Sequence, residues 1–265
     1  MGTVPGVEAP STRSAQPASE PAPQSAPRPA PESPRSPQPP WQRPNQRKPA
    51  RQPLSRDLIV DAALSVLTEE GIDAVTMRGV AKGLDTGPAS LYAHIDNKDE
   101  LHELMADRVL GEIPLPQVDP AQWRSQLKEL LLAQFRVLVG RPGIAKIVMA
   151  IMIPAGPNLL RLGEVMLTLL RSGGLSERNA AYGCDAVGLY VKAFAQEASE
   201  WAGGLFERPD MQRRSAELNA YLAALPADAY PHTLAMNELF SGQTALERFE
   251  FGLDILIDGL AGKAE

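Results

Sequence analysis

Cysteine is nearly absent from this 265-residue chain, in which Cys184 stands alone. A single thiol excludes an intramolecular disulfide and a cysteine-based zinc site, and it fits a reducing compartment. We expect Cys184 to be a small core residue. Long apolar runs are also missing, since none reaches the roughly 18 residues of a membrane span and the N-terminus has no apolar signal core. These absences predict a cytoplasmic protein that makes no membrane contact.

The groups that carry catalysis are scarce as well. The chain has three histidines and no G-x-S-x-G, H-E-x-x-H, Walker or G-x-G-x-x-G sequence. We therefore expect no catalytic residue, no cofactor and no bound metal. Aromatic residues make up only 5% of the chain and hydrophobic residues 44%, which is enough for one or two cores.

Negative charge predominates, and the formal net charge of −6 by itself argues against a nucleic-acid-binding protein. The charge is unevenly distributed, however. Residues 1–53 carry seven basic and three acidic side chains, a balance of +4, which leaves −10 for the remainder. The same segment holds 15 of the 25 prolines and few large apolar residues. We expect residues 1–53 to form a disordered tail with polyproline II character.

The end of this tail is basic and precedes a folded segment. One interpretation is an arm that lies along DNA through Arg43, Arg47, Lys48 and Arg51. An inert solubilising extension is an alternative, and the prolines from Pro34 to Pro40 would also suit a ligand for another domain.

The stretch from Thr76 to Lys98 predicts two short helices joined by a tight turn, at about 76–84 and 88–94. Apolar residues recur at helical spacing within each half. Thr76 suits an N-cap, and Pro88 suits the first helical position because no N–H donor is needed there. The second helix would expose small and polar side chains and would fit a DNA major groove about 12 Å wide. The pattern therefore predicts a helix-turn-helix.

Helix signals flank this stretch on both sides. Ser55 and Gly71 would cap a helix from 55 to about 70. Asn97 and Glu100 resemble a capping box that opens a helix running towards Ile113, where prolines stop it. This last helix is the direct covalent route out of the N-terminal helices.

Taken together, residues from about Ser55 to Leu104 resemble the DNA-binding domain of the tetracycline-repressor (TetR) family. The matching pieces are Ile59–Leu64, Glu70-Gly71, Thr76–Arg78, Val80-Ala81, Leu91-Tyr92, His94 and Asn97–Leu101. Asp85 departs from the family's usual glycine in the turn, and Thr86 from its usual apolar residue. Because aspartate tolerates the left-handed conformation better than most residues, we expect the turn to survive with looser packing.

The resemblance implies an all-α protein with three parts. These are the tail (1–53), a helix-turn-helix DNA-binding domain that includes the start of the linking helix (54–113), and a helical ligand-binding and dimerisation domain (114–265). It also implies a ligand-responsive regulator, most simply a repressor that a small-molecule effector releases from a palindromic operator in double-stranded DNA. The alternative is a helical ligand-binding or interaction protein that does not bind DNA.

The expected DNA contacts follow from the helix-turn-helix. Ser90 and Ala89 should lie nearest the base edges, whereas Tyr92, His94 and Lys98 should mainly contact phosphates. The full predicted set is Thr76, Arg78, Pro88, Ala89, Ser90, Tyr92, His94 and Lys98.

Beyond Pro120 the sequence predicts further helices, at about 120–139, 142–153, 157–172, 176–202, 210–224 and 242–261, with His232 in a loop. The last helix and the long helix at 176–202 resemble the paired helices through which TetR proteins form homodimers. The predicted interface comprises Tyr190, Phe194, Phe249, Gly252, Leu253, Leu256, Ile257 and Leu260. The alternative is that these residues form an ordinary core within one chain.

An effector pocket is implied by the resemblance, and soft or aromatic residues are candidates for its wall. The predicted set is His102, Met105, Val109, Trp123, Phe135, Met149, Met152, Tyr182 and Phe194. Each could instead be plain core, and His102 could be exposed or hydrogen-bonded. The family's histidine at the end of the linking helix aligns here with Pro114, so we do not expect magnesium-tetracycline chemistry.

Overall fold

The computed structural model describes residues 53–151, 155–202, 207–240 and 245–264. Within these ranges the regular elements are α-helices with two short 3-10 helices, and an isolated bridge joins Leu175 to Ala264. The predicted arm residues Arg43, Arg47, Lys48 and Arg51 and the predicted pocket residue Met152 lie outside the described residues. None of the described helices has the length and apolar character needed to cross a membrane.

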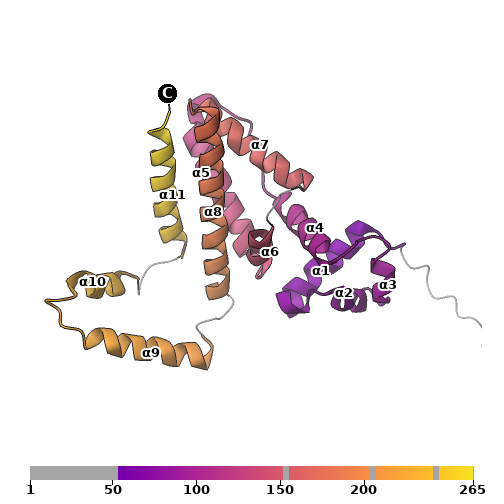
Figure 1. Cartoon of the computed structure of the whole chain (residues 1–265), viewed down its shortest axis with the longest axis horizontal. Helices are drawn as coiled ribbons and strands as arrows, with labels where there is room; N and C mark the ends of the chain where they lie inside the picture. Colours follow the sequence, from indigo (N-terminus) through magenta and orange to yellow (C-terminus); the bar gives the residue numbers. More distant parts are fainter. Residues whose placement is uncertain (1–52, 152–154, 203–206, 241–244, 265) are drawn as a thin grey trace, which may run out of the picture. The chain divides into compact units, whose positions relative to one another are not determined.

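The elements follow one another along the chain as Figure 1 shows. In order they are α1 (Arg56–Glu70), η1 (Ile72–Ala74), α2 (Met77–Gly83), α3 (Pro88–Leu91), α4 (Lys98–Leu110), η2 (Pro120–Gln122), α5 (Trp123–Val139), α6 (Ile144–Ala150), α7 (Pro157–Ser172), α8 (Glu177–Ala202), α9 (Pro209–Ala223), α10 (Pro231–Phe240) and α11 (Ala245–Ala261). This order confirms the all-α prediction for the described part of the chain.

The first helix forms as its sequence predicts. Ser55 Oγ accepts a hydrogen bond from the Leu58 N–H at 3.2 Å, which satisfies one of the free donors at the start of α1. Gly71 ends the helix at φ 84°, a conformation that glycine adopts without strain. The apolar stripe of α1, which includes Ile59 and Ala63, is buried against α2 and α4.

Helices α3 and α4 end earlier than the sequence predicts, and α6 ends at Ala150 rather than near residue 153. Helix α3 ends at Leu91 rather than near His94, and the chain continues as a turn in which the His94 and Ile95 N–H groups both donate to the Leu91 carbonyl at 2.9 Å. Helix α4 ends at Leu110 rather than near Ile113. The cause is Pro114, because the residue before a proline is pushed out of helical conformation and the last turn tightens to i→i−3 bonds.

The C-terminal helices form a bundle in which α5, α7 and α8 pack against one another and α11 packs on α5 and α8 (Figure 1). Four aromatic rings join α5, α8 and α11. The Phe135 and Phe249 rings stack with centroids 4.1 Å apart, and the Tyr190 and Phe249 rings stack at 5.3 Å. Tyr190 Oη donates to the Phe249 carbonyl at 3.0 Å. A Cβ at Gly252 would lie 2.2 Å from that Oη, so this close approach requires glycine.

Helix α10 was not predicted, and the prediction that His232 lies in a loop is wrong. His232 is exposed in the first turn of this helix. Pro231 occupies the first position of α10, where proline is favoured because no N–H donor is needed. The preceding helix α9 lies close to its predicted range and buries none of its side chains.

Candidate functional site

The turn between α2 and α3 keeps a regular geometry in spite of its unusual sequence. Asp85 has φ 49°. Its N–H donates to the Lys82 carbonyl at 3.0 Å, and the Thr86 N–H donates to the Ala81 carbonyl at 2.9 Å. This pair of bonds is a Schellman motif, which needs one residue in the left-handed region. The prediction that aspartate serves there is confirmed.

Helix α3 presents a solvent-exposed face built from small and polar residues. Leu91 and Ile95 are completely buried and anchor the segment from beneath. Most of the predicted DNA contacts are exposed, namely Arg78, Pro88, Ala89, Ser90, Tyr92 and Lys98. Thr76 and His94 are half-buried. Thr76 Oγ1 accepts from the Gly79 N–H at 3.0 Å, so this side chain caps α2.

An ion pair that the sequence argument missed holds α3 in place. Arg56, at the start of α1, donates through Nε to the His94 carbonyl at 2.7 Å and through a terminal nitrogen to Glu100 at 2.5 Å. Asn97 Oδ1 accepts from the Glu100 N–H at 2.9 Å, as predicted. The reciprocal bond differs, because Glu100 Oε2 accepts from the Asp96 N–H rather than from that of Asn97. Arg56 and Glu100 together connect the first turns of α1 and α4 to the end of α3.

Helix α4 is tied to α1 by a second arginine. Arg108 donates to Asp61 at 2.7 Å and also pairs with Asp57. Both carboxylates lie on α1, one turn apart. The charge pattern alone could not identify this pairing, because the partners are about fifty positions apart in the sequence.

The other side of α4 is tied to α7 through Asp107. Its carboxylate accepts from the Asn158 and Leu159 N–H groups at 2.9 and 3.0 Å, and from Asn158 Nδ2 at 3.0 Å. A side chain of α4 thus caps the N-terminus of α7, where free N–H groups and the helix dipole favour a negative charge. A Cβ at Gly156 would lie 2.1 Å from Asp107 Oδ1, so the contact also depends on that glycine.

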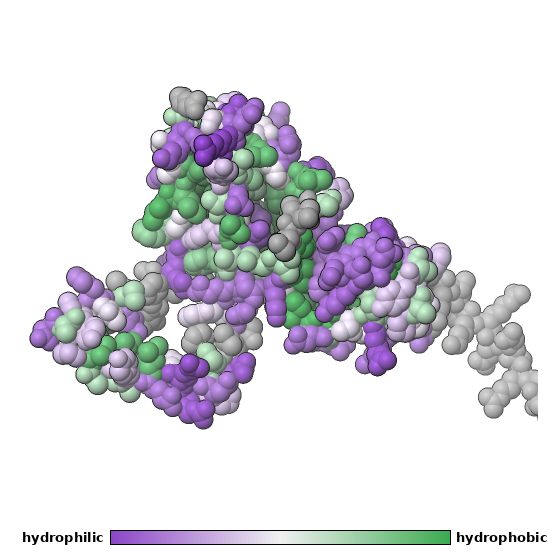
Figure 2. Space-filling view, in the orientation of Figure 1, coloured by the Kyte–Doolittle hydropathy of each residue, from purple (hydrophilic) through white to green (hydrophobic). Residues whose placement is uncertain are grey.

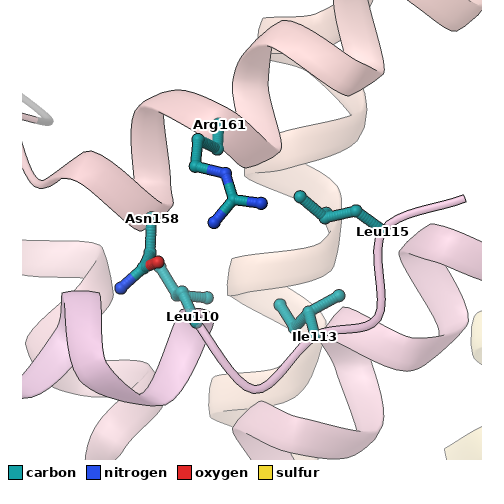
Figure 3. A pocket seen from close by; sticks show the side chains of 6 residues that line it. Leu110, Ile113, Leu115, Asn158 and Arg161 are labelled. Carbon is teal, nitrogen blue, oxygen red and sulfur yellow. The ribbon is translucent and has the colours of Figure 1, made fainter.

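Two pockets lie beside the C-terminal end of α4. The first has a volume of about 200 Å³ and is lined by Leu110, Gly111, Ile113, Leu115, Asn158 and Arg161. In Figure 3 the Arg161 guanidinium extends into the space between Asn158 and Leu115. This pocket adjoins the contact between α4 and α7, because Asn158 belongs to both.

The second pocket has a volume of about 220 Å³. Its wall combines the segment after α4 with one side of α5 and consists of Pro114, Leu115, Pro116, Gln126, Glu129, Leu130 and Ala133. Pro114 therefore lines a cavity at the position where the family's usual histidine is replaced. The proline offers no nitrogen ligand for a metal.

None of the predicted pocket residues within the described ranges lines either of these two pockets. Met105 and Val109 are completely buried, and Trp123 and Phe135 are nearly so, which makes them core residues of the chain. Met149 and Tyr182 lie at the surface instead of in the core, with 41% and 64% of their surface exposed. Tyr182 carries the Arg178 guanidinium above its ring at 5.3 Å. Phe194 is half-buried in the aromatic cluster.

His102 is half-buried on α4, and its Nε2 is buried without a hydrogen-bond partner among the described residues. Burial lowers the pKa of the imidazole below its usual value of 6.5, and the Lys98 ammonium adds to the effect. Asp99 opposes the shift by a smaller amount.

The predicted dimer interface divides into two groups. Phe249, Leu253 and Ile257 are buried within the single chain. Half-buried members are Tyr190, Phe194, Gly252, Leu256 and Leu260. Phe251 and Ile255 of α11, which the predicted set does not include, are 70% and 56% exposed. Figure 2 shows hydrophobic residues at the surface over α11.

Comparison with known proteins agrees with this architecture. Residues 59–105 match the family described as bacterial regulatory proteins, tetR family, and residues 115–264 match the description tetracyclin repressor-like, C-terminal domain. An HTH-type transcriptional regulator of Saccharopolyspora erythraea is 31% identical over 211 residues, which cover 80% of this chain and 86% of the relative. The HTH-type transcriptional repressor DrrR1 of Streptomyces coeruleorubidus is 30% identical over 225 residues, with 80% of each chain covered.

A solved structure is similar over the same region. The TetR family protein ActR from Streptomyces coelicolor, in complex with actinorhodin, is 39% identical with a TM-score of 0.71. The match covers 80% of this chain and 97% of that one. This chain therefore belongs to the tetracycline-repressor (TetR) family of transcriptional regulators, ligand-responsive repressors that bind operator DNA as homodimers.

Proposed function

We propose that α3 enters the major groove of a palindromic operator with Ala89 and Ser90 nearest the bases. Arg78, Tyr92 and Lys98 then contact phosphates at its edges, and the half-buried His94 contributes from the end of the turn. The observation that supports this assignment is the exposed small-residue face of α3 above the buried Leu91 and Ile95. Few side chains on this face reach base edges, so a second copy of the helix on the other half-site is needed for specificity.

We propose that α4 transmits the effector signal. It contacts α1 through Arg108 and α7 through Asp107, so it lies in contact with both the DNA-binding helices and the bundle. A ligand that widens either pocket at its C-terminal end would shift this helix. The two α3 helices of a dimer must stay about 34–36 Å apart to enter successive major grooves. A small tilt of α4 is therefore enough to lose this spacing.

The effector belongs in the second pocket in this proposal. Its lining is mainly apolar, with Gln126 and Glu129 as polar members, which suits an organic molecule with a few polar groups. The complex of the relative ActR with actinorhodin makes actinorhodin the first compound to test. The pocket is smaller than the roughly 300–1,000 Å³ of sites for drug-sized ligands, so such a ligand has to widen it.

The homodimer in this proposal is formed by the outer sides of α8 and α11. Phe251, Ile255 and Leu189 are large apolar side chains exposed on these two helices. Leu256 and Leu260 of α11 are half-buried. Large apolar side chains exposed to water are unfavourable and are typical of an interface between subunits.

Several further assignments stay predictions. We place the DNA-binding domain at 54–113 and the ligand-binding and dimerisation domain at 114–265, in keeping with the ranges of the two family matches. We also infer action in the cytoplasm without catalysis, as suits a regulator that binds operator DNA. The basic arm from Arg43 to Arg51 remains a candidate DNA contact.

The direct test is genomic footprinting with the purified protein, followed by addition of actinorhodin. We expect protection of a palindrome whose half-site centres are about one helical turn apart, and loss of protection when an effector binds. Uniform binding to all sequences, or no binding, would contradict the assignment of α3 and favour a helical ligand-binding protein instead.

A further inference from the structure

A buried amide in the bundle has an oxygen without a hydrogen-bond partner among the described residues. Gln134 on α5 is 5% exposed, and its Oε1 has no partner in the part of the chain that the structure describes. A buried polar group without a partner is costly, and most such groups in proteins are satisfied. Hydrogen bonding of this oxygen within the described residues therefore does not explain why a glutamine is buried at position 134.

The position of Gln134 connects it with the second pocket. Leu130 and Ala133 of α5 line that pocket. Gln134 follows Leu130 by four residues, which places it on the same side of α5 and one turn, about 6 Å, further along the helix. A ligand that widens the pocket along α5 would reach this amide next.

Other unsatisfied atoms occur on the helices that contact α5. His102 Nε2 on α4 and Gln196 Oε1 on α8 are also buried and find no partner among the residues that the structure describes, and α5 packs against both helices. By contrast, Gln126 at the pocket wall is already engaged, since it accepts from the Asp119 N–H and donates to the Gln117 carbonyl. Gln134 Oε1 differs from Gln126 Oε1 because it is buried with no hydrogen-bond partner among the described residues.

We propose that Gln134 accepts a hydrogen bond from a hydroxyl group of a mainly apolar effector. This inference rests on the proposed function, because it assigns a ligand class to the same pocket. Leu115, Leu130 and the two prolines supply the apolar surface, and the Oε1 atom supplies the acceptor.

The test compares two small probes that differ in one donor, 4-ethylphenol and its methyl ether 4-ethylanisole, by ligand-observed NMR titration. The wild-type protein should prefer the phenol by about 3- to 10-fold, the range expected for one net hydrogen bond. Gln134→Leu should abolish this preference and raise the thermal midpoint of the free protein by a few degrees, because an unsatisfied amide is removed. Gln212→Leu, an exposed position on α9, is the matched control and should change neither quantity.

The possible results distinguish the role of Gln134 from the assignment of the effector to the second pocket. An equal preference in the wild type and in Gln134→Leu, or a lower thermal midpoint in the variant, would overturn the role of Gln134 alone. Failure of both probes to bind wild-type protein that still binds its operator would overturn the pocket assignment and this inference with it.

Discussion

At the scale of single residues, the DNA-binding face depends on side chains that hold the backbone as much as on those that reach outward. Arg56 and Glu100 secure the end of α3 and the start of α4, while Ser90, Tyr92 and Lys98 remain free to contact DNA. Lys98 is at the first position of α4, where the positive end of the helix dipole also favours a phosphate.

Replacing Lys98 by Ala should weaken binding to all DNA sequences to a similar extent. The lysine acts on phosphate by counterion release, so the slope of log K against log salt should become shallower by about 0.9. Fluorescence anisotropy at several salt concentrations measures this slope. Lys146→Ala on α6 is the control, because this lysine is exposed but lies outside the DNA-binding domain. A changed sequence preference with an unchanged slope would show that Lys98 does not contact a phosphate.

His102 should make stability depend on pH. Its pKa is lowered in the folded state, so below its usual value of 6.5 the unfolded state binds more protons and stability falls with falling pH. His102→Leu should reduce this fall, which urea unfolding at about pH 7.5 and about pH 5.5 would measure. An equal or larger fall in the variant would mean that other groups cause the acid sensitivity.

At the scale of elements, the sequence predicted local structure well and distant contacts poorly. The caps at Ser55, Thr76 and Asn97 were predictable because each acts on an N–H group three residues away. The Asp107 cap of α7 was not, because its partners are 51 and 52 residues distant. Burial was hard to predict for the same reason, since periodicity shows that a face is apolar but not whether its own chain or another covers it.

Replacing Asp107 by Ala should therefore destabilise the junction between α4 and α7. Two backbone N–H groups at the start of α7 lose their acceptor, and the expected loss is about 1–2 kcal/mol in the free energy of unfolding. Urea denaturation measures the loss, and Asp258→Ala at an exposed position on α11 serves as the control. Equal stability of the two variants would mean that the Asp107 contact contributes little.

At the scale of the whole molecule, operator binding requires two DNA-binding domains, one from each subunit of a dimer. The double variant Phe251→Arg with Ile255→Arg places charge on the exposed apolar side of α11 and should yield a monomer in sedimentation experiments. Operator affinity should fall by at least about 100-fold, because the second half-site is no longer bound intramolecularly. Leu160→Arg, at a similarly exposed position on α7, should remain dimeric. A stable dimer in the double variant would place the interface elsewhere.

In the proposed function, the second pocket, between α5 and the segment after α4, is energetically coupled to the DNA-binding face of α3. Linkage requires that an effector weaken operator binding by the same factor by which the operator weakens effector binding, typically about 5- to 150-fold. The most direct measurement is the affinity of the compound that releases the operator, with actinorhodin tried first, for the dimer with and without saturating operator DNA. We expect the effector to bind more weakly in the presence of operator, by the same factor by which it weakens operator binding. Equal affinities would contradict it.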